Sequence, residues 1–237
     1  MLLILRVILM TVYFLLVSLL GSLYCLTRPF HPNNTSLFGR LFSWGGHRIL
    51  GVSVTVEGTE IFKDLGPCVI VANHQSNMDL FTFGHVVPPR GVSVGKKSLR
   101  YIPLFGQLYW LSGNVMIDRS NPEKARKSME ITREAMLQRQ MKIWVFPEGT
   151  RNGGKNLLPF KQGAFRMAID AGVPIVPVCV NGYLSTLTLN KWHGGKIKIQ
   201  VLPPVSTKGK TLEELDVLVA SVHAQMQACI NALDAQK

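Results

Sequence analysis

The first part of the chain contains twenty consecutive residues without a formal charge, Val7 to Leu26, which are rich in Leu, Val, Ile and Phe. A helix of this length can cross the hydrocarbon core of a bilayer. A cleaved signal peptide is the alternative, but the apolar run is longer than such signals usually are, and no clear small-x-small cleavage site follows it. We therefore expect a retained membrane anchor, which either spans the bilayer or lies in one leaflet.

A second apolar segment follows the anchor. Residues 36–50 combine Leu, Phe, Trp and Ile with basic side chains, a pattern typical of a helix at a membrane surface or of an ordinary amphipathic helix in a domain. We predict an N-terminal membrane-associated helical segment over residues 1–50 and a single larger domain over residues 51–237.

The chain is strongly basic, with a net charge of +12, and nearly all of this charge lies after residue 27. Basic side chains beside a membrane attract anionic lipids and anionic substrates. The Lys and Arg residues are scattered, without a zinc-finger, homeodomain or aromatic RNA-binding pattern, so we expect no nucleic-acid partner. Arg28 and Arg40 follow the anchor and only Arg6 precedes it, which places the larger domain in the cytoplasm by the positive-inside rule.

Beyond residue 50, segments typical of strands and helices alternate. Strands are expected at 52–57, 67–72, 92–94, 115–117, 143–146, 173–180 and 196–202, and helices at 78–86, about 121–140, 161–171 and 212–233. This alternation predicts an α/β fold with a mixed, largely parallel sheet flanked by helices. Pro174 and Pro177 are difficult to place in a central strand, so we expect their segment at a sheet edge or along the wall of a groove.

The four cysteines, Cys25, Cys68, Cys179 and Cys229, show neither CxxC nor metal-ligand spacing. Each lies in an apolar segment. We therefore expect reduced, buried thiols and no metal site.

A polar segment, NHQSNMD at residues 73–79, directly follows the apolar strand predicted at 67–72. An imidazole takes a proton from a hydroxyl near pH 7 most readily when a carboxylate accepts a hydrogen bond from its other nitrogen. Five residues of a regular helix turn through about 140°, so His74 and Asp79 can meet only if His74 lies in the loop and Asp79 in the first helical turn. Ser76 is a suitable N-cap and would put Asp79 at the third helical position.

The same residues also have a purely structural interpretation. Ser-x-x-Asp is a capping box in which Asp79 complements the helix dipole, and His74 is then an ordinary loop residue. Histidine and aspartate at this spacing are common by chance, so a catalytic interpretation needs support from other segments.

Three further segments end or continue predicted strands. They are GNVMIDR at 113–119, FPEGTR at 146–151 and VPIVPV at 173–178. Loops that follow the strands of an α/β sheet converge on its ligand site. Arginine suits a phosphate, so Arg119 and Arg151, together with Lys96 or Lys161, would form a phosphomonoester site. The alternatives are a surface ion pair for Arg119 and a tight turn at FPEGTR with a glycine at positive φ.

The order and content of these segments resemble the glycerolipid acyltransferase superfamily, whose blocks read NHxxxxD, GxxxxxR, FPEGTR and VPIxPV. All four blocks occur here, in order, between residues 73 and 178. Stretches such as VGKKSL at 94–99 and PLFGQLYW at 103–110 also resemble the bacterial 1-acyl-sn-glycerol-3-phosphate acyltransferases, and the likeness extends along almost the whole chain. Four blocks in order are specific for the superfamily, whereas one alone would not be.

This resemblance implies transfer of a fatty acyl group from acyl-ACP or acyl-CoA to the 2-hydroxyl of lysophosphatidic acid, which gives phosphatidic acid. It implies a bacterial inner membrane location, with an acyltransferase catalytic domain (residues 51–237) on the cytoplasmic side. His74 would be the general base and Asp79 its orienting partner. A thioester is already activated, so no ATP, metal or other cofactor is implied.

The resemblance also implies roles in substrate binding. Residues implied at the acceptor site are Glu148, Gly149, Thr150 and Arg151, with Arg119 at its phosphate. Lys96 matches a lysine near the family's catalytic centre, and the adjacent Lys97 takes its place if the register shifts by one. The groups that stabilise the oxyanion stay open, and the apolar segment 104–111 either lines an acyl groove or packs in the core.

The sequence also allows three activities other than acylation of lysophosphatidic acid. The chain could acylate a different lysophospholipid, hydrolyse a thioester with water activated by His74, or bind membrane lipid without catalysis.

Overall fold

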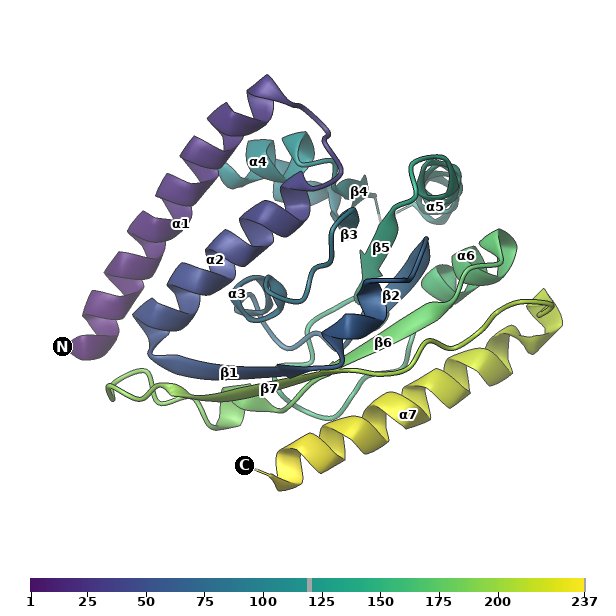
Figure 1. Cartoon of the computed structure of the whole chain (residues 1–237). Helices are drawn as coiled ribbons and strands as arrows, with labels where there is room; N and C mark the ends of the chain where they lie inside the picture. The colour runs from purple at the N-terminus through teal and green to yellow at the C-terminus, as the bar shows by residue number, and fades with distance from the viewer. Residues whose placement is uncertain (119–120, 237) are drawn as a thin grey trace.

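The core of the fold is a seven-stranded sheet (Figure 1). Its strands are β1 (Val52–Glu57), β2 (Cys68–Ala72), β3 (Gly91–Lys96), β4 (Val115–Ile117), β5 (Lys142–Val145), β6 (Ile175–Val180) and β7 (Gly195–Val201). They lie in the order β1-β7-β6-β2-β5-β3-β4, and every neighbouring pair is parallel except β6 and β7. This structure, a computed structural model, describes residues 1–118 and 121–236. The predicted mixed, largely parallel sheet is confirmed.

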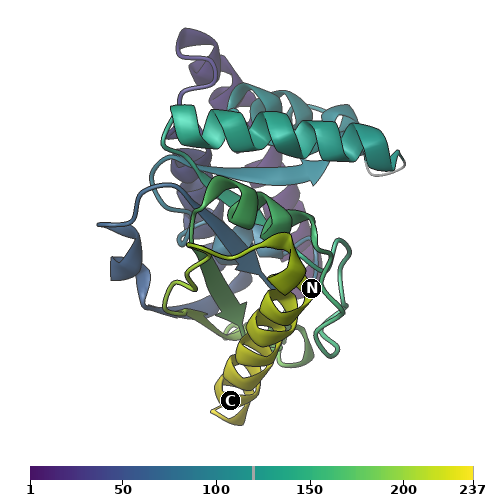
Figure 2. The same ribbon diagram turned by 90° about the vertical axis from the view of Figure 1, so that its right-hand side faces the viewer.

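Helices cover both faces of the sheet (Figure 1, Figure 2). They are α1 (Leu2–Thr27), α2 (Asn34–Leu50), α3 (Asp79–Phe83), α4 (Phe105–Leu111), α5 (Pro122–Gln138), α6 (Gly163–Ala171) and α7 (Leu215–Ala235), with short 3-10 turns at η1 (Thr59–Phe62), η2 (Lys97–Tyr101), η3 (Tyr183–Ser185) and η4 (Leu212–Glu214). The first four helices lie on one side of the sheet and the last three on the other. The sheet is therefore the middle layer of three.

The central strand β2 is buried on both faces, which explains its unbroken apolar sequence. Val69 and Val71 contribute to the hydrophobic cluster shared with α5, α6 and α7. Ile70 and Ala72 contribute to a second cluster on the opposite face, below α2 and α3. The strand ends where the first polar side chain, Asn73, appears.

Helix α1 lies lengthwise along the rest of the molecule (Figure 1). One of its faces packs on α2 and α4, where Val17, Phe42 and Leu108 share a hydrophobic cluster. Near its start, the buried guanidinium of Arg6 donates hydrogen bonds of 2.7–3.0 Å to three backbone carbonyls in the loop 189–192 before β7. Among the described helices, α1 alone is long and apolar enough to cross a membrane, and much of its surface is exposed.

Helix α3 differs from its prediction. It begins at Asp79 and ends at Phe83, so it is shorter than the predicted 78–86, and Asp79 is its first rather than its third residue. Of the predicted capping box, the bond between the Asp79 carboxylate and the N–H of Ser76 is formed, whereas the Ser76 hydroxyl accepts from Met78 instead of from Asp79. Ser76 Oγ accepts from the backbone N–H of Met78 at 2.9 Å, and Asp79 Oδ2 accepts from the N–H of Ser76 at 3.1 Å.

Helix α2 holds α3 in place by a close backbone approach. A Cβ atom built on Gly84, just after α3, would lie 1.9 Å from the carbonyl oxygen of Gly39 in α2, so only glycine fits there. Ser43 of α2 donates a hydrogen bond of 2.5 Å to the carbonyl of Phe81 in α3. The position of Asp79 at the start of α3 therefore depends on α2.

The segment with two prolines forms β6, which lies between β7 and β2, so the expected sheet edge is wrong. Pro174 precedes the strand. Pro177 lies inside it, and its carbonyl accepts from the N–H of Leu202 at 2.9 Å. Pairing with the chain beyond β7 is then interrupted until Val205, which bridges to Ile175. Pro177 lies opposite Leu202, the first residue after β7, so its missing N–H costs one ladder bond only where the β6–β7 pairing ends.

Candidate active site

The predicted site segments lie at one edge of the sheet, where its parallel strands end. His74 comes two residues after β2, Glu148 three residues after β5, and Lys96 is the last residue of β3. These strands are consecutive in the sheet, and neighbouring strands lie about 4.8 Å apart, so His74 and Lys96 emerge from strands about 10 Å apart. Arg119, which follows β4 in the sequence, lies outside the described residues.

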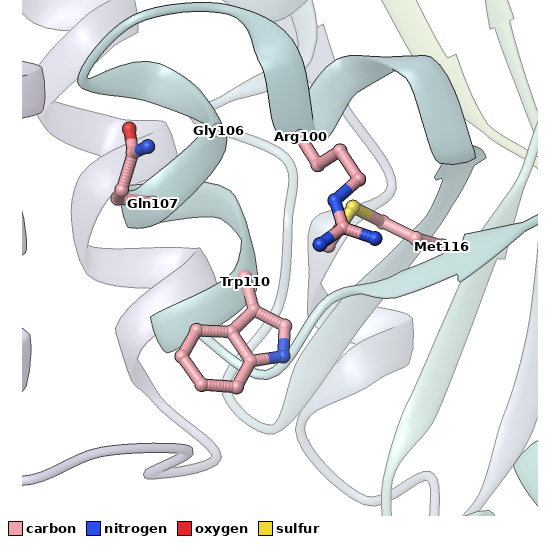
Figure 3. Close-up of a pocket in the computed structure, with 5 residues that line it drawn as sticks. All are labelled: Arg100, Gly106, Gln107, Trp110 and Met116. Atoms are coloured by element: carbon pink, nitrogen blue, oxygen red, sulfur yellow. The ribbon is translucent and has the colours of Figure 1, made fainter.

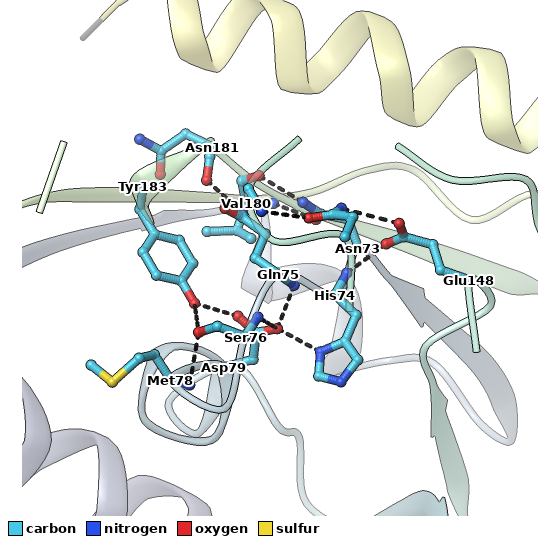
Figure 4. A network of polar contacts seen from close by, with 12 residues as sticks. Asn73, His74, Gln75, Ser76, Met78, Asp79, Glu148, Val180, Asn181 and Tyr183 are labelled. Carbon is cyan, nitrogen blue, oxygen red and sulfur yellow. Dashed lines mark hydrogen bonds and ion pairs between the residues drawn. The ribbon is translucent and has the colours of Figure 1, made fainter. Parts of the chain in front are cut away.

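The imidazole of His74 and the carboxylate of Asp79 face each other (Figure 4). Nδ1 of His74 lies 2.6 Å from Oδ2 of Asp79. With Nδ1 donating its proton to the carboxylate, Nε2 carries the lone pair of the neutral ring. Within residues 1–118 and 121–236 no group hydrogen-bonds to Nε2, and 18% of the His74 side chain is exposed. This nitrogen is therefore open to a ligand.

The carboxylate of Asp79 is only 3% exposed, and both of its oxygens are paired. Oδ2 accepts from the backbone N–H groups of Gln75 and Ser76 at 2.7 and 3.1 Å, in addition to His74. Oδ1 accepts from the phenol of Tyr183 at 2.5 Å. The capping and the histidine-pairing interpretations of Asp79 are thus realised by the same carboxylate, and four donors fix its orientation.

The loop after β5 holds His74 in three ways. The imidazole stacks on the ring of Phe146, with centroids 4.0 Å apart and an interplanar angle of 14°. The backbone N–H of His74 donates to Oε1 of Glu148 at 2.7 Å. The carbonyl of His74 accepts from the N–H of Asn152 at 2.8 Å.

Glu148 is itself buried, with 3% exposed, and both of its oxygens contact protein groups. Oε1 takes the N–H of His74, and Oε2 accepts from Nδ2 of Asn152 at 3.0 Å and from the N–H of Leu158 at 2.9 Å. One carboxylate therefore joins the loop after β2 to two points of the loop after β5.

Comparisons with known proteins find relatives along almost the whole chain. Residues 53–181 match the acyltransferase family. The chain is 42% identical to the 1-acyl-sn-glycerol-3-phosphate acyltransferase of Salmonella typhimurium and 41% identical to that of Escherichia coli, each over 99% of this chain and 95% of the relative. This chain belongs to the acyltransferase family. A solved structure, the 1-acyl-sn-glycerophosphate acyltransferase PlsC of Thermotoga maritima, matches with a TM-score of 0.75 and 26% identity, over 98% of this chain and 94% of that one.

In this acyltransferase the FPEGTR segment forms the predicted tight turn. Gly149 has a φ of +70°, and a Cβ atom there would lie 2.8 Å from Cε of Lys161, so both the backbone and the space favour glycine. Thr150 and Arg151 are exposed at the tip. Throughout the described part of the chain, the guanidinium of Arg151 has no ion-pair partner.

Two of the three candidate lysines, Lys96 and Lys97, differ in their surroundings. Lys97 lies 3.5 Å from Oδ2 of Asp118, with which it forms an ion pair. Lys96 is exposed, and none of the described residues forms an ion pair with it. Lys96 is therefore the one of these two without a described ion pair. The third candidate, Lys161, lies at the FPEGTR turn, where a Cβ atom on Gly149 would come within 3.0 Å of its Nζ.

Sequence reasoning missed Tyr183, which lies in η3 directly after β6. Its ring is fully buried, and its hydroxyl contacts Oδ1 of Asp79 and Oγ of Ser76. Burial, and then the nearby Asp79 carboxylate, raise the pKa of Tyr183 well above its usual value. The only sequence signal was its place after a strand that ends at the same edge as β2.

Of the two predicted alternatives for the segment 104–111, core packing is confirmed, and the acyl groove stays a prediction. One face of α4 packs on α1 and α2 through Phe105, Leu108 and Leu111. The other face borders an open pocket of about 360 Å³ (Figure 3). The pocket is lined by Arg100, Gly106, Gln107, Trp110 and Met116.

Proposed function

We propose that this acyltransferase moves a fatty acyl group from acyl-ACP or acyl-CoA to the 2-hydroxyl of 1-acyl-sn-glycerol 3-phosphate, which yields phosphatidic acid. The names of its full-length relatives support this reaction. The observation that carries the chemistry is the 2.6 Å contact between Nδ1 of His74 and Oδ2 of Asp79, which leaves Nε2 as a base facing open space.

In the proposed reaction Nε2 of His74 takes the proton of the acceptor hydroxyl while that oxygen attacks the thioester carbonyl. The negative charge moves to the carbonyl oxygen of a tetrahedral intermediate. Collapse of the intermediate breaks the carbon–sulfur bond, and the leaving thiolate takes the proton back from the imidazolium. Asp79 stabilises that imidazolium between the two steps and keeps the ring in the required tautomer.

The phosphate of the acceptor is proposed to bind the cations at the same sheet edge. Arg151 and Thr150 lie exposed at the tip of the FPEGTR turn, and Lys96 is exposed at the end of β3. Arg119 is proposed as a further phosphate ligand on the basis of its sequence block. The buried carboxylate of Glu148 contributes to the acceptor site through its hold on His74 rather than by direct contact.

We propose that α1 lies along one leaflet rather than across the bilayer, because both of its ends contact the same domain. Arg6 binds the loop 189–192, and beyond the other end the N–H of Phe30 donates to the carbonyl of Leu111 at 2.8 Å. A helix of 26 residues is about 39 Å long, so a spanning α1 would carry one of these contacts across the membrane. Its exposed leucines then face lipid, with the catalytic domain on the cytoplasmic side of the inner membrane.

The proposed donors are carried by anionic partners, either the acidic carrier protein or the phosphates of coenzyme A. The net charge of +12 supports binding of either one. The rates of acyl transfer from acyl-ACP and from acyl-CoA, measured at equal concentration, therefore identify the preferred donor.

The test is acylation of radiolabelled lysophosphatidic acid by the purified protein in detergent–lipid micelles, with acyl-ACP and acyl-CoA in separate arms. We expect phosphatidic acid as the product. His74→Ala should lower the rate by about 10²- to 10⁴-fold, whereas His193→Ala, at an exposed loop position, should not change it.

Three other outcomes would overturn this proposal. Acylation of a different lysophospholipid only would assign another acceptor, and release of free fatty acid without any acceptor would assign a hydrolase. Binding of the lysolipid without turnover by either donor would assign a lipid-binding protein.

A further inference from the structure

Tyr183 touches the catalytic pair but belongs to none of the four sequence blocks. Its side chain is fully buried, and its hydroxyl donates to Oδ1 of Asp79 at 2.5 Å and lies 3.2 Å from Oγ of Ser76. Figure 4 shows that Tyr183 and His74 approach the carboxylate from opposite sides.

The two oxygens of Asp79 are supported unequally. Oδ2 accepts from His74 and from two backbone N–H groups, whereas Tyr183 is the donor observed at Oδ1 among the described residues. A buried carboxylate oxygen without a donor is strongly unfavourable. Without the phenol, the charge on Oδ1 would lack a donor and the carboxylate would become a stronger base, which would alter its bond to His74.

The segment that carries Tyr183 is itself fixed. Oδ1 of Asn181 accepts from the N–H of Lys198 in β7 at 2.9 Å, and the N–H of Gly182 donates to Oδ1 of Asp234 in α7 at 2.7 Å. The chain segment that carries Tyr183 is therefore fixed to β7 and to α7.

The same segment is tied to the loop that carries His74. Asn73 exchanges two hydrogen bonds of 2.9 Å with the backbone of Val180, and Nε2 of Gln75 donates to the carbonyl of Asn181 at 2.7 Å. The residues on both sides of His74 are thus joined to the end of β6. The base and the phenol belong to one rigid unit.

We propose that Tyr183 is a positioning residue of the acyl-transfer site: its phenol holds Oδ1 of Asp79 so that Oδ2 is presented to Nδ1 of His74. This inference rests on the proposed function, because it assigns Tyr183 a task in that reaction. The phenol stays protonated across the working pH range, since its pKa is raised by burial and by Asp79, so it remains a donor throughout.

The proposal predicts the direction of a change in pH dependence. A hydrogen bond from the phenol draws negative charge away from the carboxylate. Without it, the carboxylate holds the proton on the imidazole more strongly, and the base stays protonated up to a higher pH. The acidic limb of the pH–rate profile should therefore move to higher pH when the phenol is removed.

The experiment compares Tyr183→Phe with Thr207→Val in the acylation assay. The control removes a buried hydroxyl that donates to the carbonyls of Ala168 and Val173, at the opposite end of β6 from the site. For Tyr183→Phe we expect kcat to fall by about tenfold, with little change in the KM of the acceptor, and the acidic limb to move to higher pH. For Thr207→Val we expect wild-type kinetics and an unchanged limb.

A Tyr183→Phe protein with wild-type kcat and an unmoved acidic limb would overturn the proposal. An equal fall in kcat for both variants with no movement of either limb would also overturn it, because that pattern is general destabilisation. If Tyr183→Phe does not fold, 3-fluorotyrosine placed at position 183 keeps the volume and makes the phenol a stronger donor. The limb should then move to lower pH, and an unmoved limb would refute the role.

A measurement without substrate separates this inference from the proposed function. The ¹⁵N resonances of the His74 ring can be followed through a pH titration in wild type and in Tyr183→Phe. An inactive wild type refutes the proposed function, whatever the titration shows. Superimposable titrations in an active enzyme refute the role of Tyr183 alone.

Discussion

Replacing Glu148 by Gln changes one buried group and distinguishes two roles for this side chain. The resemblance to the family implies an acceptor-binding residue, whereas the structure gives its carboxylate three protein donors, the N–H groups of His74 and Leu158 and the amide of Asn152. Glutamine keeps the shape of the side chain but replaces one acceptor oxygen by an NH₂ donor. That donor must face either the N–H of His74 or the groups on the other side.

The magnitude follows from these contacts. A hydrogen bond to a charged group contributes about 1.5–3 kcal/mol, and a buried donor left without an acceptor costs about 1–3 kcal/mol. We therefore expect Glu148→Gln to lower the free energy of unfolding by about 3–5 kcal/mol, within the roughly 5–15 kcal/mol that a folded domain has. A displacement of His74 by about 1 Å should lower kcat by about 100-fold, with a smaller change in the KM of lysophosphatidic acid.

Denaturant unfolding in detergent micelles and steady-state acylation at varied acceptor concentration measure both quantities. Glu134→Gln, at an exposed position of α5, is the matched control and should behave as wild type. If Glu148→Gln instead kept wild-type stability and kcat while the KM of the acceptor rose tenfold or more, direct contact with the acceptor would be the correct role and the positioning argument would be refuted.

Four further predictions concern other groups. Arg6→Ala removes three hydrogen bonds and should release the N-terminal end of α1 from the domain. Proteolysis at that end should then be faster in vesicle-bound protein, and an unchanged rate of proteolysis would argue against α1 lying along the domain. Gly149→Ala should lower the unfolding free energy by about 1–2 kcal/mol because of its φ of +70°, and a stability equal to wild type would show that the turn relaxes. Arg151→Ala should raise the KM of lysophosphatidic acid more than it lowers kcat, and an unchanged KM would remove it from the phosphate site. Iodoacetamide at pH 8 should modify Cys229 before Cys68. A hydrogen bond with the thiol of Cys179 lowers the pKa of Cys229, whereas burial raises the pKa of Cys68 to about 12. Mass spectrometry that finds Cys68 modified first would contradict this prediction.

The parts of the site that could be predicted from the sequence depend on short stretches of chain. His74 and Asp79 are five residues apart, so the end of one strand and the cap of the next helix suffice to bring them together. The turn at Gly149 likewise depends on a backbone conformation that its own neighbours impose. The error over β6 has the opposite cause, because whether a strand is central depends on the whole sheet. Pro177 is tolerated there because it lies opposite Leu202, where the pairing with β7 ends.

The groups that support the pair could not be predicted, because their contacts depend on strand order. Glu148 meets His74 across 74 residues of sequence, and Tyr183 meets Asp79 across 104. Both contacts arise because β5 and β6 are the two neighbours of β2. No local pattern states that order, although the alternation of strands and helices correctly predicted that a shared edge would exist.

The order of the strands also explains how the base can be held firmly while one side of its ring stays open. The neighbour on one side, β5, supplies the ring of Phe146 and the carboxylate of Glu148, which fix the plane and the backbone of His74. The neighbour on the other side, β6, leads to Tyr183, which fixes the far oxygen of Asp79. These supports reach the ring face, the backbone and the partner carboxylate, and none of them occupies Nε2. Perturbing the β5 side should therefore displace the base, whereas perturbing the β6 side should change its protonation, and the two kinds of defect are distinguished by whether the acidic limb of the pH–rate profile moves.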